Sequence, residues 1–210
     1  MYKSFDIANA SELPPLPEGY RYFDCIGGTQ EKRYFLAPQD IPRTYFLKNY
    51  EHLLDECLFP IYNHNGICVR QDPSFPIPGF YIVSPVEHYT SLDQMDLILN
   101  NRLFLILHEI RKGMRERLGI KLTILIYEEK PKKSCSVHFL LLPIYSDSYS
   151  SSESFNFYNY LLSYEFSYRK YRNDILAYNQ KMKDYIKQIK LQELDDLIES
   201  QPSLMLEYQV

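Results

Sequence analysis

The spacing of hydrophobic and polar residues predicts six strands. The strand-like runs are rich in β-branched and aromatic residues, and they cover residues 20–26, 33–36, 67–70, 80–84, 120–127 and 136–145. Gly27-Gly28-Thr29-Gln30 separates the first two runs, so these are expected to form a hairpin. The run at 136–145 is apolar on both faces apart from His138, which predicts a central position in its sheet.

Two segments before residue 120 have helical spacing. In 44–58 the apolar residues recur at intervals of three and four, which predicts one helix after Pro42. Ser91-Leu92-Asp93-Gln94 has the form of a capping box, with Ser91 as N-cap, and predicts a long helix from 91 to about 118 that Gly119 ends. The order of strand, strand, helix, strand, strand therefore predicts an α+β fold, an antiparallel sheet with a long helix packed on it.

The C-terminal part of the chain carries a seam rich in tyrosine. Ten residues recur at spacings of four and three: Phe157, Leu161, Tyr164, Tyr168, Tyr171, Ile175, Tyr178, Met182, Tyr185 and Ile189. This pattern predicts one long helix. Its aromatic stripe suits packing on the body of the same chain, self-association, or stacking on nucleic-acid bases.

These elements divide the chain into three parts. Residues 1–56 form an N-terminal extension, which begins with a proline-rich arm at 1–19 and continues into the hairpin and the first helix. Residues 57–145 form the α+β core. Residues 146–210 comprise a polar connection and the long C-terminal helix.

Composition excludes several function classes. The 210 residues are 45% hydrophobic with a formal net charge of -4, so the chain has a sizeable core and no excess of basic residues for non-specific binding of nucleic acid. No 18-residue apolar run or secretory signal is present, which predicts a cytoplasmic protein without a membrane contact. The four cysteines form no C-x-x-C pair and no Gly-rich phosphate loop occurs, so we expect neither a metal site nor a cofactor.

His138 is the only ionisable residue in the run from 136 to 143, and two interpretations of it stay open. An imidazole among apolar neighbours is either a hydrogen-bonded core residue or part of a functional site. A second segment favours the site. In it, Asp72, Pro78-Gly79, Tyr81-Ile82-Val83, Pro85 and His88 follow one another at fixed spacings.

Together these segments, within residues 57–145, resemble the histidine-triad (HIT-like) superfamily of nucleotide hydrolases and transferases. The upstream signature of that family is an Asp, a Pro-Gly pair, a hydrophobic strand, a Pro and a His. Its downstream signature is three alternating histidines, which fall here on Ser136, His138 and Leu140. Only the middle histidine is kept.

The resemblance implies roles for individual residues. His138 would be the nucleophile that attacks the α-phosphorus, and Asp72 would bind ribose hydroxyls. His88 would support the nucleophile or contact phosphate, and Lys132, Lys133, Ser134 and Ser136 would bind the substrate near His138. The alternative interpretations are a turn residue for Asp72, a strand-end residue for His88 and a solvated turn for the lysines.

Three functions remain open on the sequence. The first is an enzyme that cleaves or transfers a nucleoside monophosphate from a phosphoanhydride or phosphoramidate through His138. The second is a catalytically weakened module that binds a nucleotide, and the third is a protein-interaction module that uses the tyrosine-rich helix. The resemblance also implies a homodimer paired through the helix and the sheet edge.

Overall fold

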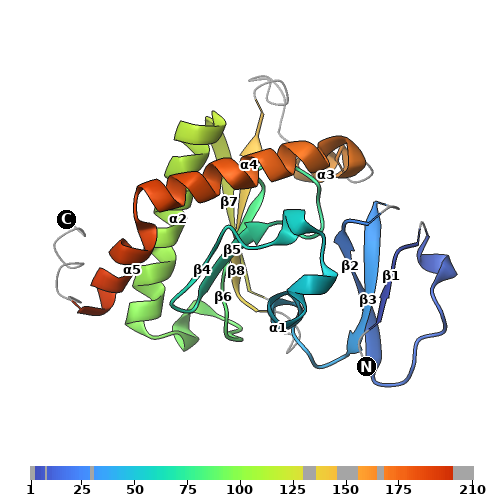
Figure 1. Cartoon of the computed structure of the whole chain (residues 1–210). Coiled ribbons are helices and arrows are strands. Elements are labelled where there is room, and N and C mark those ends of the chain that lie inside the picture. The colour runs from blue at the N-terminus through green and yellow to red at the C-terminus, as the bar shows by residue number, and fades with distance from the viewer. Residues whose placement is uncertain are drawn as a thin grey trace.

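The computed structural model describes residues 3–7, 9–28, 31–129, 136–145, 156–164 and 168–200. Two antiparallel sheets and a set of helices build an α+β fold (Figure 1), as the order of sequence patterns predicts. The larger sheet has the strand order β4-β5-β6-β8-β7, and the smaller one has the order β1-β3-β2. Of the helices in these ranges, none is long and apolar enough to cross a membrane.

The five-stranded sheet carries the candidate site. Its strands are β4 (Tyr62–His64), β5 (Ile67–Gln71), β6 (Tyr81–Pro85), β7 (Leu122–Glu128) and β8 (His138–Ile144). Strand β8 lies between β6 and β7, which confirms the central position predicted from its two apolar faces. Strand β4 was not predicted from the sequence, and a turn follows it. That turn is confined to Asn65 and Gly66, both at positive φ, and it joins β4 to β5 as a tight hairpin.

Helix α2 (Leu97–Leu118) covers one face of this sheet. The buried Leu103, Ile106 and Ile110 of the helix share a core with strand residues such as Val69 and Val83. On the opposite face, Leu142 and Ile144 pack against Tyr160 and Leu161 of the C-terminal region, and another part of that face lines a cavity. Gly119 ends the helix in the left-handed conformation, as predicted.

The predicted start of this helix at Ser91 is wrong. The segment that resembles a capping box forms a separate 3-10 turn, Leu92–Gln94, in which the Gln94 side chain accepts from the Thr90 N–H at 2.8 Å. The chain then becomes extended at Met95, which is buried in the core. Asp96 caps α2 by accepting from the Leu99 N–H at 2.7 Å.

The N-terminal region is a second small sheet with a short helix. It contains β1 (Lys3–Phe5), β2 (Tyr20–Ile26), β3 (Lys32–Pro38) and α1 (Arg43–Asn49). The hairpin of β2 and β3 was predicted. The expectation of an unpacked arm at 1–19 is wrong in part, because β1 pairs with β3 and a 3-10 turn forms at Ala10–Glu12.

The helix predicted over 44–58 is also shorter than expected. After α1 the chain makes two 3-10 turns, Glu51–Leu53 and Glu56–Leu58. Asp55 accepts from the Cys57 N–H at 3.2 Å and so starts the second turn. Arg172 of the C-terminal region pairs with Asp55 and with Glu56, at 3.3 Å and 2.8 Å, which fixes this segment by a tertiary contact invisible in its own pattern.

The tyrosine-rich seam forms α3 (Phe157–Leu162) and α4 (Tyr168–Gln188) rather than one helix, and α5 (Leu191–Ser200) follows after Lys190 at positive φ. Helix α4 runs from α2 to the side of the small sheet (Figure 1). Its buried Tyr168 and Ile175 belong to the N-terminal core, and its Met182 and Tyr185 belong to the core under α2. The seam therefore packs on the body of its own chain, which was one of its three predicted uses.

Candidate functional site

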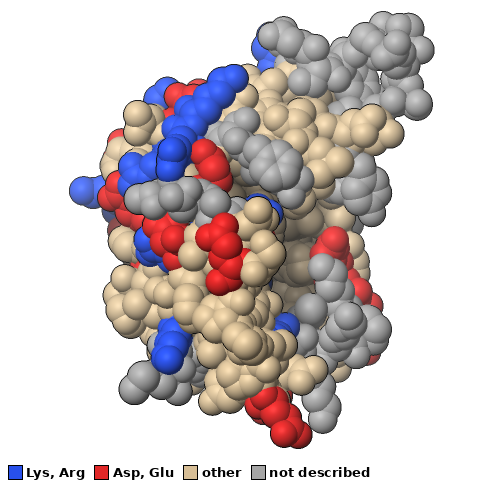
Figure 2. Space-filling model, turned by 90° about the vertical axis from the view of Figure 1, so that its right-hand side faces the viewer, with Lys and Arg blue, Asp and Glu red and all other residues tan. Residues whose placement is uncertain are grey.

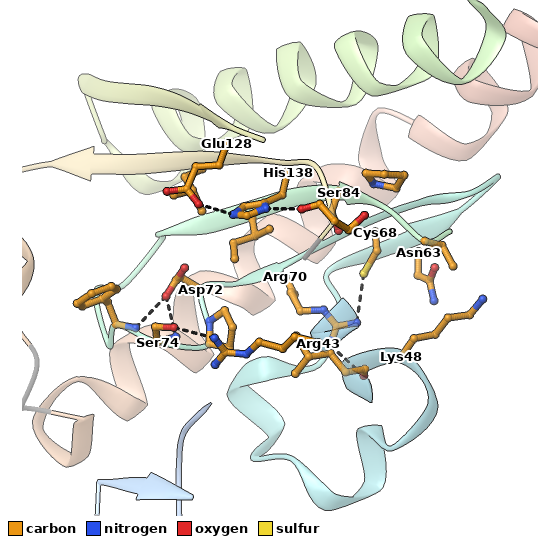
Figure 3. Close-up of a pocket in the computed structure, with 18 residues that line it drawn as sticks. Arg43, Lys48, Asn63, Cys68, Arg70, Asp72, Ser74, Ser84, Glu128 and His138 are labelled. Carbon is orange, nitrogen blue, oxygen red and sulfur yellow. Dashed lines mark hydrogen bonds and ion pairs between the residues drawn. The ribbon is translucent and has the colours of Figure 1, made fainter. Parts of the chain in front are cut away.

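A cavity of about 270 Å³ lies on the face of the five-stranded sheet opposite α2. Figure 3 shows its lining, which comes from β5, β6, β7, β8, α1 and the loop after β5. Because side chains alternate along a strand, Cys68, Arg70, Ile82, Ser84 and Leu140 face the cavity while their neighbours face α2. The other lining residues are Arg43, Leu47, Lys48, Asn63, Asp72, Pro73, Ser74, Phe75, Pro85, Val86, Glu128, Ser136 and His138.

His138 lines this cavity at the first position of β8, with 18% of its side chain exposed. Its Nδ1 atom lies 2.8 Å from the carbonyl oxygen of Ser136. A carbonyl only accepts, so Nδ1 carries the proton of this hydrogen bond and the ring is held in one orientation. Nε2 is therefore the ring nitrogen that is left for a second contact.

Glu128 contacts Nε2 of His138. The sequence analysis did not identify Glu128 as a site residue. Its Oε2 lies 3.1 Å from Nε2 of His138, because β7 pairs with β8 in a register that sets Glu128 directly across from His138. The signal was present in the sequence. A hairpin predicted from 120–127 and 136–145 brings the last residue of its first strand near the start of its second, so a carboxylate at 128 belongs beside the histidine.

Asp72 both forms a turn and lines the cavity. Its Oδ1 atom accepts from the backbone N–H groups of Ser74 and Phe75, at 2.7 Å and 2.8 Å. Burial raises the pKa of the Asp72 carboxyl above its ordinary value, against the opposing influence of those two hydrogen bonds and of Arg43 and His138. The turn interpretation holds, and the carboxyl is also exposed to whatever occupies the cavity.

The remaining residues expected at the site separate into three cases. Ser136 lines the cavity, and its hydroxyl donates to the Tyr89 carbonyl oxygen at 3.1 Å, which ties β8 to the loop after β6. His88 is exposed and is not part of the lining, so the structure does not bring it beside His138. Lys132, Lys133 and Ser134 lie outside the described residues.

Three basic residues also line the cavity, and the sequence analysis did not single them out. Arg43 and Lys48 come from α1, and Arg70 comes from β5. Arg70 had a visible signal, because it ends the predicted strand 67–70 two residues before Asp72, and side chains two residues apart in extended chain share a face. Arg43 and Lys48 had none, since nothing in residues 43–48 indicates that α1 closes the cavity.

No protein-family model matches the sequence, and no curated protein shows a significant match. The solved structures do show a likeness. A hypothetical histidine triad nucleotide-binding protein from Sulfolobus tokodaii strain7 aligns with a TM-score of 0.51 and 13% identity, over 70% of this chain and 93% of that one. The chain therefore has a HIT-like fold.

Two further structures align less closely. A Zn-bound histidine triad family protein from Mycobacterium smegmatis has a TM-score of 0.48 at 12% identity, over 69% of this chain and 94% of that chain. A Hit-like protein from Bartonella henselae has a TM-score of 0.45 at 12% identity, over 67% and 94%. In the described part of this chain, no group of three or more His, Cys, Asp and Glu is placed to hold a metal ion.

Proposed function

We propose that the cavity binds a nucleotide and that the protein is a nucleotide hydrolase or nucleotidyltransferase acting through a covalent nucleotidyl-His138 intermediate. The substrate is a nucleoside phosphoanhydride or phosphoramidate. The observation that carries this proposal is the geometry of His138, whose ring is fixed by the Ser136 carbonyl with Nε2 in a cavity that also holds basic residues. The HIT-like fold and the upstream segment from Asp72 to His88 support it.

The reaction proceeds in two displacements. The Nε2 lone pair of His138 forms a bond to the α-phosphorus, and the bond from phosphorus to the leaving group breaks with its electron pair on the leaving group. Water or another acceptor then attacks the phosphorus while the Glu128 carboxylate takes its proton, and the P–Nε2 bond breaks to restore the imidazole. Nδ1 keeps its proton throughout and donates it to the Ser136 carbonyl oxygen, and this hydrogen bond stabilises the positive charge of the substituted ring.

Glu128 accepts and later donates the proton that lies between its carboxylate and Nε2 of His138. Two such atoms 3.1 Å apart share a proton, so Nε2 becomes nucleophilic only when the carboxylate takes that proton. Glu128 then passes the proton to the leaving oxygen or nitrogen. A carboxylate thus supplies the acid–base group that the family pattern loses at Ser136 and Leu140.

The other expected contacts are part of the same proposal. The Asp72 carboxylate accepts from ribose hydroxyls, because its Oδ2 atom takes part in no hydrogen bond with the residues that the structure describes. Ser136, Lys132, Lys133 and Ser134 bind the phosphate beside His138.

The test is depletion of a nucleotide panel, read by mass spectrometry. The panel covers dinucleoside polyphosphates, nucleotide sugars and nucleoside phosphoramidates, and each is incubated with the wild-type chain and with His138→Ala. We expect one substrate class to disappear only with the wild type. If both folded proteins leave every member intact, the enzyme proposal fails for that panel.

A second candidate is nucleotide binding without turnover. The contact between Glu128 and Nε2 favours it, because a carboxylate held on that atom also hinders its attack on phosphorus. Glu128→Gln separates the two functions. Loss of the proton acceptor lowers the rate about 10²-fold or more if Glu128 assists the reaction, whereas the rate rises if Glu128 blocks it. Binding by calorimetry with no depletion by any variant would select the second candidate.

A further inference from the structure

We propose that Arg43, Lys48 and Arg70 form a subsite for a second phosphate group of the ligand, separate from the phosphate that His138 contacts. We call these three residues the cationic wall. In Figure 3 they lie across the cavity from His138 and Glu128. The inference rests on the proposed function and refines its substrate class: the ligand is a nucleotide that carries at least two phosphates.

Arg70 is the residue of the cationic wall that gives the strongest argument for a bound anion. The residue is 6% exposed, and its guanidinium donates to the carbonyl oxygens of Leu47 at 3.2 Å and Leu58 at 3.4 Å, and to Cys68 Sγ at 3.3 Å. All three acceptors are neutral. Among the described residues no carboxylate lies within ion-pair distance of Arg70. Because buried charges in proteins are normally paired, a cation in this state calls for an anion from outside the chain.

Arg43, on helix α1, is likewise held by hydrogen bonds to groups other than carboxylates. It donates to Ser74 Oγ at 3.1 Å, to the Asp24 carbonyl oxygen and to Cys25 Sγ, and its buried Nε atom has no hydrogen-bond acceptor. The carboxylates of Asp72 and Asp24 lie near enough to act on the charge of Arg43, but neither forms an ion pair with it within the described residues. Arg43 is therefore held in place by neutral groups with part of its donor capacity unused.

The balance of charge in the lining favours a polyanion. Lys48, which is exposed, adds a third positive charge at the edge of the cavity. Against these stand Asp72 and Glu128, and Glu128 is already engaged with His138. A single phosphate placed at His138 would leave the cationic wall facing neutral ligand atoms. A second phosphate would compensate it with charge-assisted hydrogen bonds.

Two residues of the cationic wall come from outside the part of the chain that resembles the family. Arg43 and Lys48 belong to α1, outside residues 57–145 that carry the family resemblance. The N-terminal extension therefore contributes directly to ligand choice. The second phosphate is either the β-phosphate of a nucleoside 5′-diphosphate or a separate group on the ribose, and the experiment distinguishes these sources.

The experiment measures binding of defined nucleotides to the full-length chain by calorimetry. The probes are the 5′-monophosphates, 5′-diphosphates and 3′,5′-bisphosphates of adenosine, guanosine, cytidine and uridine, with mass spectrometry to confirm that each stays intact. Lys48→Gln removes one charge of the cationic wall without disturbing a buried contact, because Lys48 is exposed. The matched control is Lys183→Gln, which removes an exposed lysine of α4 that does not line the cavity.

We expect the second phosphate to tighten binding about tenfold or more, and Lys48→Gln to remove a several-fold part of that gain, while Lys183→Gln leaves it unchanged. The type of probe that gains identifies the source of the phosphate. Equal affinity for mono- and bisphosphorylated probes, or no effect of Lys48→Gln, overturns the subsite alone. If no probe binds the wild type, the proposed nucleotide function fails together with it.

Arg70→Gln gives a second measure of the same subsite. Glutamine removes the buried charge and keeps a polar side chain with N–H donors, although it is shorter than the arginine that donates to Leu47 and Leu58. The expected result is a loss of at least tenfold in affinity for the doubly phosphorylated probe and little change for the monophosphate. An equal loss for both probes would overturn the assignment of Arg70 to the second phosphate, and Lys48→Gln decides the matter if this variant does not fold.

Discussion

At the scale of single residues, the site depends on which neighbours a side chain acquires from other strands. His138 has its ring orientation from Ser136, two residues before it, and its contact at Nε2 from Glu128, ten residues before it. The first contact is local, and the second exists only because β7 and β8 pair in a particular register. The same histidine would be an ordinary core residue without the cavity beside it.

Asp72→Asn tests the electrostatics of the cavity through its pH dependence. Burial raises the folded-state pKa of Asp72 above its ordinary value of 3.8. The stability that this carboxyl contributes is therefore fully present below about 3.8 and is lost as pH rises through the folded-state pKa. Asparagine keeps an oxygen that accepts from Ser74 and Phe75 but does not ionise.

As pH rises from about 3.8, the free energy of unfolding of the variant should increase relative to that of the wild type, by at most about 1.4 kcal/mol per pH unit. Above the folded-state pKa of Asp72 this difference should stay constant. Urea unfolding between pH 3.5 and 8 measures the difference. Asp174→Asn, at an exposed position, is the control for loss of one negative charge. A difference that shrinks with rising pH would show that the sign of the Asp72 shift is wrong.

At the scale of elements, helix patterns predicted where helices form better than where they begin and end. Helices α2 and α4 follow their apolar spacing, yet α2 begins at Leu97 rather than near Ser91 and the segment 50–58 is not α-helical. In both places a buried or ion-paired residue sets the backbone, since Met95 must reach the core and Arg172 holds Asp55 and Glu56. Such tertiary contacts override local propensity.

The packing of α4 on α2 leaves too little room for a Cβ atom at Gly113. A Cβ at this position would lie 2.6 Å from Cδ1 of Tyr185 and 2.8 Å from Cε of Met182. Alanine normally stabilises a helix relative to glycine by about 1 kcal/mol, but the clash with a buried ring outweighs this gain.

We expect Gly113→Ala to lower the free energy of unfolding by about 1–3 kcal/mol in urea titrations. Lys112→Ala, at the exposed neighbouring position, should change it by no more than about 0.5 kcal/mol. An alanine variant as stable as the wild type would mean that α2 and α4 are not packed this closely.

At the scale of the whole molecule, α4 joins the two parts of the chain into one unit. It contributes Tyr168 and Ile175 to the N-terminal core, Met182 and Tyr185 to the core under α2, and Asn179 between them, which donates to the Cys57 carbonyl oxygen at 2.8 Å. Because the seam is buried inside the chain, the interaction hypothesis loses the surface that it relied on. The homodimer stays a prediction.

This arrangement predicts that the two parts unfold together. Ile175→Ala removes a fully buried side chain from the N-terminal core and should lower the free energy of unfolding by about 2–5 kcal/mol. Native-state hydrogen exchange should show the same loss of protection in β2, β3, β5 and β6. The exposed Asp174→Ala serves as control, and a loss confined to β2 and β3 would mean that α4 does not couple the two sheets.

The surface charge of the molecule agrees with its modest net charge. On the face drawn in Figure 2, Lys and Arg side chains are interspersed with Asp and Glu rather than gathered in one basic patch. Non-specific contact with nucleic acid requires a continuous basic surface, which this face does not offer. The positive charge that matters for the proposed function lies instead inside the cavity, on Arg43 and Arg70.

The sequence by itself determined the fold class, the central place of β8 and the helix on one face of the sheet, and it indicated His138 as a candidate site residue, because these follow from residue periodicity and from a short spaced motif. Only the tertiary structure decided which groups surround that histidine. Glu128 reaches it through strand register, and Arg43 and Lys48 reach the cavity because α1 folds over the sheet. Periodicity encodes which face of an element is buried, but the partner of that face is fixed by the packing of segments far apart in the chain.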